Sequence, residues 1–169
     1  MTRRAVVQKW IFYSLCALAL VLVQSLLLVR VQVWGVHPFL LPAIAVIPVT
    51  LERDEGALLF SVFFGLACDL LTPVAGLPCF YALAFLVSGG LAWLLSGRVV
   101  AAGLVCSLAA AASALVVCGV LHLAVLAGSQ SVDVTAAAVL AGKEAALSLP
   151  LTVLVHYPFR RICLLTQRD

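Results

Sequence analysis

The sequence predicts an all-α integral membrane protein: a single domain, residues 1–169, folded as a compact bundle of six transmembrane helices. Two features of the composition lead to this prediction. Hydrophobic residues make up 65% of the chain and charged residues only 10%, whereas about 25% of residues are charged in soluble domains. So few charges cannot cover a water-soluble fold, and a formal net charge of +3 is too small for a phosphate-binding surface. A soluble enzyme, a disordered chain and a nucleic-acid-binding domain are therefore excluded.

The third feature is the arrangement of the apolar residues in long segments, cut by short polar or Pro/Gly breaks. A helix rises about 1.5 Å per residue, so about 20 residues cross a hydrocarbon core of about 30 Å. The first, fifth and sixth segments reach that length, and the second and third fall short. Helix is expected throughout, because unpaired backbone polar groups are costly in lipid. The predicted spans are 10–29, 38–51, 57–71, 79–95, 99–127 and 134–157.

The basic residues predict the orientation of these segments, because Lys and Arg are enriched in cytoplasmic loops. If all six segments cross from a cytoplasmic start, eight basic residues lie inside and only Arg30 lies outside. If 38–51 does not cross, every later loop changes side, and six basic residues lie outside. We therefore expect six crossings with both termini in the cytoplasm. The eight residues are Arg3, Arg4, Lys9, Arg53, Arg98, Arg160, Arg161 and Arg168.

The sequence carries no motif for catalysis or for binding a cofactor or a metal. Its six cysteines form no CxxC pair, and its three histidines stand at no metal-ligand spacing from them. An intramembrane aspartyl protease needs two aspartates, and only Asp69 is available; serine-nucleophile, P-loop and HExxH motifs are missing. We therefore expect no enzyme activity and no cofactor, and we expect the cysteines to pack as small hydrophobic residues.

Charged residues within the apolar segments are candidate functional positions, because a charge at a helix centre costs roughly 2.5–3.5 kcal/mol on insertion scales. Asp69, near the outer end of its segment, either accepts backbone N–H bonds from the following turn, which we favour, or contacts a partner. Lys143 and Glu144 either neutralise one another, or face a neighbouring helix or partner, or lie at the outer interface because the last helix begins late. The charged sequence at 52–56 is interpreted as a solvated hairpin tip.

Small residues recur every four positions along three of the segments. Such stripes let helices approach closely in lipid, and we interpret them as internal packing rather than as a surface for a partner's helix. They are Ala102, Cys106, Ala110, Ala114 and Cys118 in the fifth segment, Ala138, Gly142 and Ala146 in the sixth, and Ser88, Ala92 and Ser96 in the fourth.

The residues GLACDLL at 65–71, followed by Gly76-Leu77-Pro78 and an apolar segment, resemble the core signature of the MreD family of bacterial rod shape-determining membrane proteins. In that family a Gly-rich third helix ends in Asp-Leu, and a short loop with a Leu-Gly-like turn leads to the next helix. Here that turn reads Ala-Gly. A proline before a short second helix, a proline in the last helix and a basic end are also similar. The candidate structural or partner-contact residues are Gly65, Asp69, Gly76, Lys143, Glu144 and Pro150.

The resemblance implies a non-enzymatic scaffold of the cell-elongation machinery, the elongasome, in the bacterial cell membrane. Proteins of the MreD family associate with MreC. Through MreC they connect the MreB cytoskeleton to the RodA-type glycosyltransferase and its penicillin-binding transpeptidase partner, and so position peptidoglycan synthesis and maintain cell shape.

The alternative is the substrate-binding membrane subunit of a vitamin-type uptake transporter, a six-helix protein of similar size and fold. Such subunits usually carry Ala-x-x-x-Ala in the first helix, whereas in this chain valine follows Ala17 and Ala19 four residues later. A binding pocket needs convergent polar groups, and the sequence offers few near the outer face. These are Asp69, Tyr81, His122 and Gln130. We therefore favour the scaffold.

Overall fold

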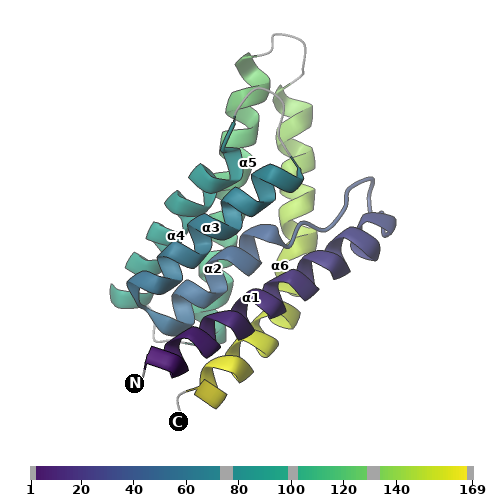
Figure 1. The fold of residues 1–169 in the computed structure, drawn as a ribbon. Coiled ribbons are helices and arrows are strands. Elements are labelled where there is room, and N and C mark those ends of the chain that lie inside the picture. The colour runs from purple at the N-terminus through teal and green to yellow at the C-terminus, as the bar shows by residue number, and fades with distance from the viewer. Residues whose placement is uncertain (1–2, 73–77, 99–102, 129–133, 167–169) are drawn as a thin grey trace.

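The computed structural model describes residues 3–72, 78–98, 103–128 and 134–166, and these ranges form six α-helices and one short 3₁₀ helix. The helices alternate in direction, so that both chain ends lie at the same end of the bundle (Figure 1). Three helical stretches are long and apolar enough to cross a membrane. They are Val6–Arg30, Leu104–Gly128 and Thr135–Thr166. The elements are α1 (Arg3–Leu26), η1 (Leu28–Arg30), α2 (Leu41–Glu52), α3 (Glu55–Leu71), α4 (Phe80–Arg98), α5 (Leu104–Gly128) and α6 (Val134–Thr166).

The order of the six helices agrees with the prediction, but the last helix is longer than predicted. α6 continues nine residues beyond the predicted end at 157, through Pro158, to Thr166. The reason is packing, because Val155, Phe159 and Cys163 recur every four residues and are all buried. The inward face of the helix is therefore continuous across the proline. The first helix likewise begins earlier than predicted, at Arg3.

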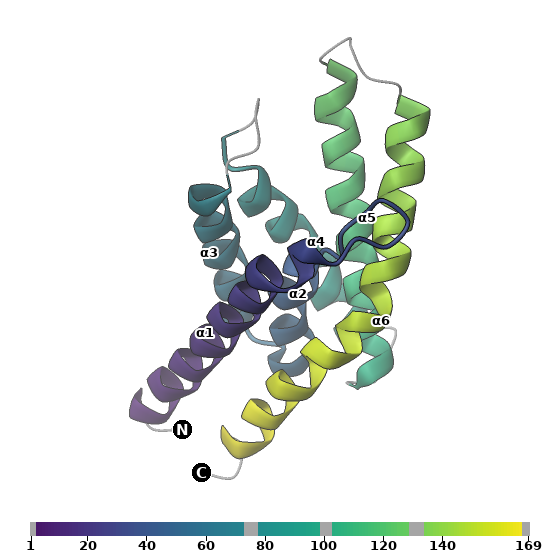
Figure 2. The same ribbon diagram turned by 90° about the vertical axis from the view of Figure 1, so that its right-hand side faces the viewer.

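The short helix α2 is the centre of the bundle. All ten residues from Leu41 to Thr50 are buried, and α2 packs against α1, α3, α4, α5 and α6 (Figure 2). Twelve helical residues span only about 18 Å, which is less than the hydrocarbon core. Because other helices surround it, α2 meets protein rather than lipid along its length, and this accounts for an apolar helix without a polar face.

The N-terminus of α2 obtains its hydrogen bonds from two distant helices. The first N–H groups of a helix have no intrahelical acceptor. Here the N–H of Leu40 donates to Gln24 Oε1 of α1 at 3.0 Å, and the N–H of Phe39 donates to Ser148 Oγ of α6 at 2.8 Å. Ser148 Oγ in turn donates to the carbonyl of Glu144 at 2.7 Å. These contacts fix the entry to α2 between α1 and α6.

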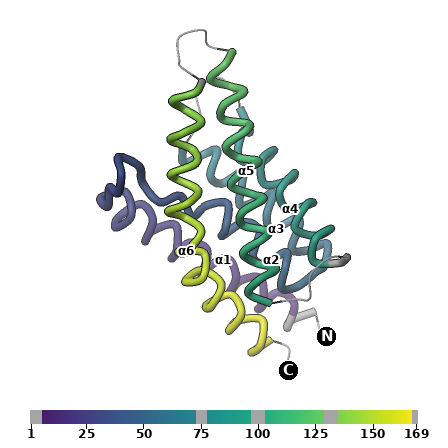
Figure 3. The backbone as a smooth tube through the Cα atoms, turned by 180° about the vertical axis from the view of Figure 1, so that it is seen from behind, coloured from purple at the N-terminus to yellow at the C-terminus, as the bar shows by residue number. Residues whose placement is uncertain are grey.

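The outer faces of the helices carry large apolar side chains. Leu22, Phe63, Val116 and Leu154, on four different helices, are each more than half exposed. α5 and α6 lie side by side and extend beyond the other helices at the end away from the termini (Figure 1 and Figure 3). An apolar exterior around a fully enclosed helix is compatible with a membrane bundle.

Two of the three predicted small-residue stripes pack internally, and the third does not. The stripes on α4 (Ser88, Ala92, Ser96) and α5 (Cys106, Ala110, Ala114, Cys118) are buried; Ala102 lies outside the described residues. The expectation was wrong for α6, where Ala138, Gly142 and Ala146 are exposed. The inner face of α6 is instead formed further along by Ser148, Thr152 and His156, which are buried. The α6 stripe therefore faces outward.

Candidate functional site

Gly65 and Asp69 lie one turn apart on α3 and face the start of α4. A Cβ added to Gly65 would lie 2.7 Å from the Cα of Ala82 and 2.7 Å from the carbonyl oxygen of Tyr81. Real Cβ atoms do not approach backbone so closely, so only glycine permits this separation of α3 and α4. The two residues that carry the family resemblance thus determine how this helix pair packs. Gly76 lies outside the described residues.

Asp69 closes the same hairpin with two charge-assisted hydrogen bonds. Its Oδ1 accepts the N–H of Tyr81 at 2.8 Å, and its Oδ2 accepts the N–H of Ala82 at 2.9 Å. A carboxylate at the positive end of a helix is favourable. Asp69 therefore accepts backbone N–H bonds as we expected, but from the first turn of the next helix rather than from the loop. Its contact with a partner stays a prediction.

Lys143 and Glu144 lie within α6 and face different surroundings. The idea that the last helix begins near Lys143 is wrong, because α6 begins at Val134. Lys143 is exposed, whereas Glu144 is half-buried and lines a cavity. Pro150, six residues further along α6, is exposed on the surface of the bundle.

The cavity beside Glu144 lies among α4, α5, α6 and Phe39, which is in the segment just before α2. Its volume is about 160 Å³. The lining combines aromatic rings, small residues and one carboxylate. The residues are Phe39, Phe80, Tyr81, Leu115, Cys118, Gly119, His122, Ala141, Glu144 and Ala145. Three of the polar groups, from Tyr81, His122 and Glu144, come from three different helices and converge on one space.

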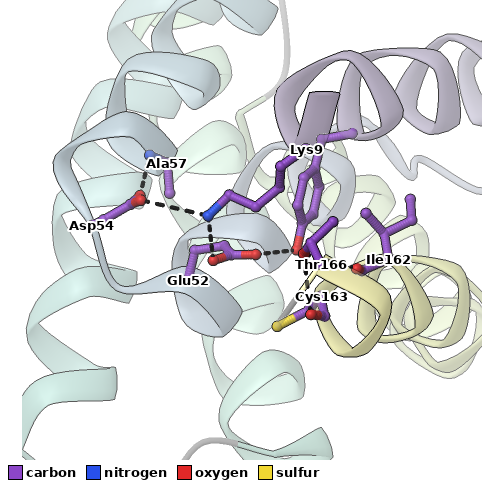
Figure 4. Close-up of polar contacts among 8 residues, drawn as sticks. Lys9, Glu52, Asp54, Ala57, Ile162, Cys163 and Thr166 are labelled. Atoms are coloured by element: carbon purple, nitrogen blue, oxygen red, sulfur yellow. Dashed lines mark hydrogen bonds and ion pairs between the residues drawn. The ribbon is translucent and has the colours of Figure 1, made fainter. Parts of the chain in front are cut away.

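A second polar cluster, which was not predicted from the sequence, lies at the end of the bundle that holds both termini. Lys9 Nζ of α1 lies 2.7 Å from Glu52 Oε2 of α2, and each side chain is only 7% exposed. Tyr13 donates from its hydroxyl to Glu52 Oε1 at 2.8 Å. Asp54 Oδ2 is 3.8 Å from the same ammonium, and its Oδ1 accepts the N–H of Ala57 at the start of α3 (Figure 4).

This cluster corrects the interpretation of 52–56 as a solvated tip. Arg53, Asp54 and Glu55 are exposed as expected, but Glu52 forms a buried ion pair. The pairing is possible because Tyr13 and Phe159 stack at 5.6 Å and bring α1 and α6 together beside the end of α2. The cluster joins three helices.

A third polar group crosses the core. Ser107 Oγ of α5 lies 2.9 Å from His156 Nδ1 of α6 and 3.1 Å from Thr50 Oγ1 of α2. All three side chains are no more than 1% exposed. Serine and histidine can form a nucleophile–base pair; here both side chains are buried, and their contacts connect α2, α5 and α6.

None of the six cysteines, all of which lie within the described residues, forms a disulfide bond, and four of them are buried. Cys16 is half-buried, and Cys79 is exposed immediately before α4. Among the described residues no group of three or more His, Cys, Asp or Glu side chains is placed to hold a metal ion.

Within the described residues the fold is all-helical, with three helical stretches long and apolar enough to cross a membrane. No family model, no curated protein and no solved structure matches the chain.

Proposed function

We propose that this protein is a non-enzymatic membrane scaffold of the bacterial cell-elongation complex, of the MreD type. In this proposal it spans the cell membrane six times with both termini in the cytoplasm. It binds an MreC-like membrane protein, and through it MreB and the RodA and penicillin-binding transpeptidase pair. Support comes from residues 65–71, which carry the resemblance and which set the packing of α3 on α4 through Gly65 and Asp69.

The exposed small-residue stripe on α6 is the observation that carries the scaffold proposal. Ala138, Gly142 and Ala146 stand at four-residue spacing on an outward face. Small residues at this spacing let the backbone of another helix approach closely in lipid, where van der Waals packing drives association. A Cβ at Gly142 would meet nothing within 4 Å in this chain, so the space beside it is open to a partner's helix.

The experiment is co-purification with an MreC-like protein in mild detergent, using Gly142→Leu as the test variant. An added Cβ at Gly142 meets nothing within 4 Å, so we expect the fold to persist in this variant. The larger side chain blocks close approach, and we expect capture of the partner to fall at least about tenfold, which corresponds to about 1.4 kcal/mol. Gly90→Leu on α4 is the matched control, because a Cβ there also meets nothing within 4 Å. Equal capture by both variants would show that the α6 stripe is not the contact with the partner. Absence of capture by the unaltered chain would refute the proposed scaffold function.

The alternative function, a substrate-binding subunit of a vitamin-type transporter, gains support from one observation. The cavity brings Tyr81, His122 and Glu144 together. Glu144 thus adds a polar group to those that the sequence predicted near the outer face. Purification of the chain with a bound vitamin, and without an MreC-like partner, would favour the transporter subunit. We retain the scaffold proposal because the resemblance covers α3 and the start of α4, the two helices whose backbones lie close together at Gly65.

A further inference from the structure

The cavity among α4, α5 and α6 has an aromatic wall. The ring of Phe80 lies edge-on to Tyr81, at a centroid distance of 5.2 Å, and edge-on to His122 at 6.2 Å. Phe39, from the segment before α2, adds a third contact at 6.2 Å from Tyr81. These four rings contact one another in series along the lining of the cavity and offer an apolar surface to the body of a ligand.

The same cavity is lined by one carboxylate, that of Glu144. On α6, Glu144 lines the cavity together with Ala141 and Ala145, whose side chains are small and occupy little of its space. Among the described residues, no side chain or backbone group donates a hydrogen bond to the Glu144 carboxylate, although His37 interacts with it electrostatically. An ionised carboxylate offers about four acceptor positions. No Lys or Arg is among the residues that line the cavity.

We propose that this cavity binds a small organic cation, an amine with a compact apolar body. Its ammonium group would donate hydrogen bonds to Glu144, and its apolar part would lie against Phe80 and Tyr81. The volume of about 160 Å³ sets the size, because an engineered protein cavity of about 150 Å³ accommodates benzene. The ligand class is therefore a monoamine with a body no larger than a single ring.

This inference does not rest on the scaffold function. The cavity lies on the inner side of α6, lined by Ala141, Glu144 and Ala145, whereas the proposed partner contact uses the outward stripe on the same helix. A scaffold without a ligand and a ligand-binding protein without the partner are separate outcomes of separate measurements.

The test uses the full chain in detergent and three probes of similar size: benzylamine, which is a cation at neutral pH, benzyl alcohol and benzoate. Ligand that binds only the folded state raises the unfolding midpoint. We expect a saturable rise with benzylamine alone. Glu144→Gln keeps the size of the side chain and removes its charge, and we expect the affinity for benzylamine to fall at least about tenfold. The control is Lys143→Gln, which removes an exposed charge one residue away and should bind as the unaltered chain does.

A second variant tests the position of the ligand rather than the charge. Ala145→Leu fills the cavity without altering the carboxylate, and we expect it to weaken benzylamine binding to a similar degree. Equal midpoint shifts with all three probes would show partition into the micelle and would overturn the proposal. So would undiminished binding by Glu144→Gln, or no saturable binding by the folded chain up to about 10 mM benzylamine.

Discussion

Removal of one charge from the Lys9–Glu52 pair should destabilise the bundle more than removal of both. Glu52→Gln leaves the Lys9 ammonium buried without its partner at 2.7 Å, and Lys9→Met leaves the Glu52 carboxylate with the Tyr13 hydroxyl as its neutral donor. In the double variant both charges are gone, and the amide oxygen of glutamine can still accept the hydrogen bond from Tyr13.

The expected magnitudes follow from the burial of the pair. Breaking a buried ion pair by removing one partner costs about 3–5 kcal/mol, because an uncompensated charge stays in the interior. Asp54 lies 3.8 Å from Lys9 but is 47% exposed, so it replaces Glu52 only in part, and we expect about 3 kcal/mol for Glu52→Gln. For the double variant we expect a loss of no more than about 1 kcal/mol, the net value of an ordinary hydrogen bond, because no unpaired charge is left in the interior.

Equilibrium unfolding in mixed micelles, followed by circular dichroism, measures these free energies. Trp10 fluorescence gives a local signal, because its ring lies 5.5 Å from Tyr13. Lys143→Met removes an exposed charge and should change the free energy of unfolding by less than about 0.5 kcal/mol. If the double variant loses the sum of the two single losses, the two charges do not interact and the reasoning fails.

Two further predictions concern the α3–α4 hairpin. Asp69→Ala removes the acceptor of two N–H groups at the start of α4 and should lower the free energy of unfolding by about 1–2 kcal/mol. Asp69→Asn should lower it less, because its amide oxygen can still accept one of these hydrogen bonds. Equal losses in the two variants would contradict the capping role. Cys79 is exposed immediately before α4, and in the proposed topology the segment between α3 and α4 lies outside the cell membrane. A membrane-impermeant maleimide should therefore label it in intact cells whose outer permeability barrier has been opened, and should not label Cys79→Ser. Labelling of Cys79 only after lysis would contradict the proposed orientation.

The sequence was sufficient to predict the helices and their order. Apolar segments of helical length indicate helices directly, and Asp69 was predicted to accept backbone N–H bonds beyond the end of its helix, as it does. The α5 stripe at Cys106, Ala110 and Ala114 was also predicted correctly to pack inside, because small residues on a long apolar helix favour close helix contact.

The polar contacts between distant segments could not be predicted. Lys9 and Glu52 are 43 residues apart, and Ser107 and His156 are 49 residues apart, so no local spacing pairs them. The direction of the α6 stripe depends on how the helix is rotated against α5, which its own sequence does not specify. Glu144 shows the same limit, because a single carboxylate in an apolar helix gives no sign of the cavity that it faces.

The central position of α2 has a consequence for how the protein is assembled. A translocation channel sorts segments by length and apolarity, and α2, at about 18 Å, is shorter than the hydrocarbon core of about 30 Å. The acceptor for the N–H of Phe39 is Ser148, which the ribosome adds 109 residues later. The second segment thus cannot complete its hydrogen bonding until α6 has been synthesised as far as Ser148 and has packed against it.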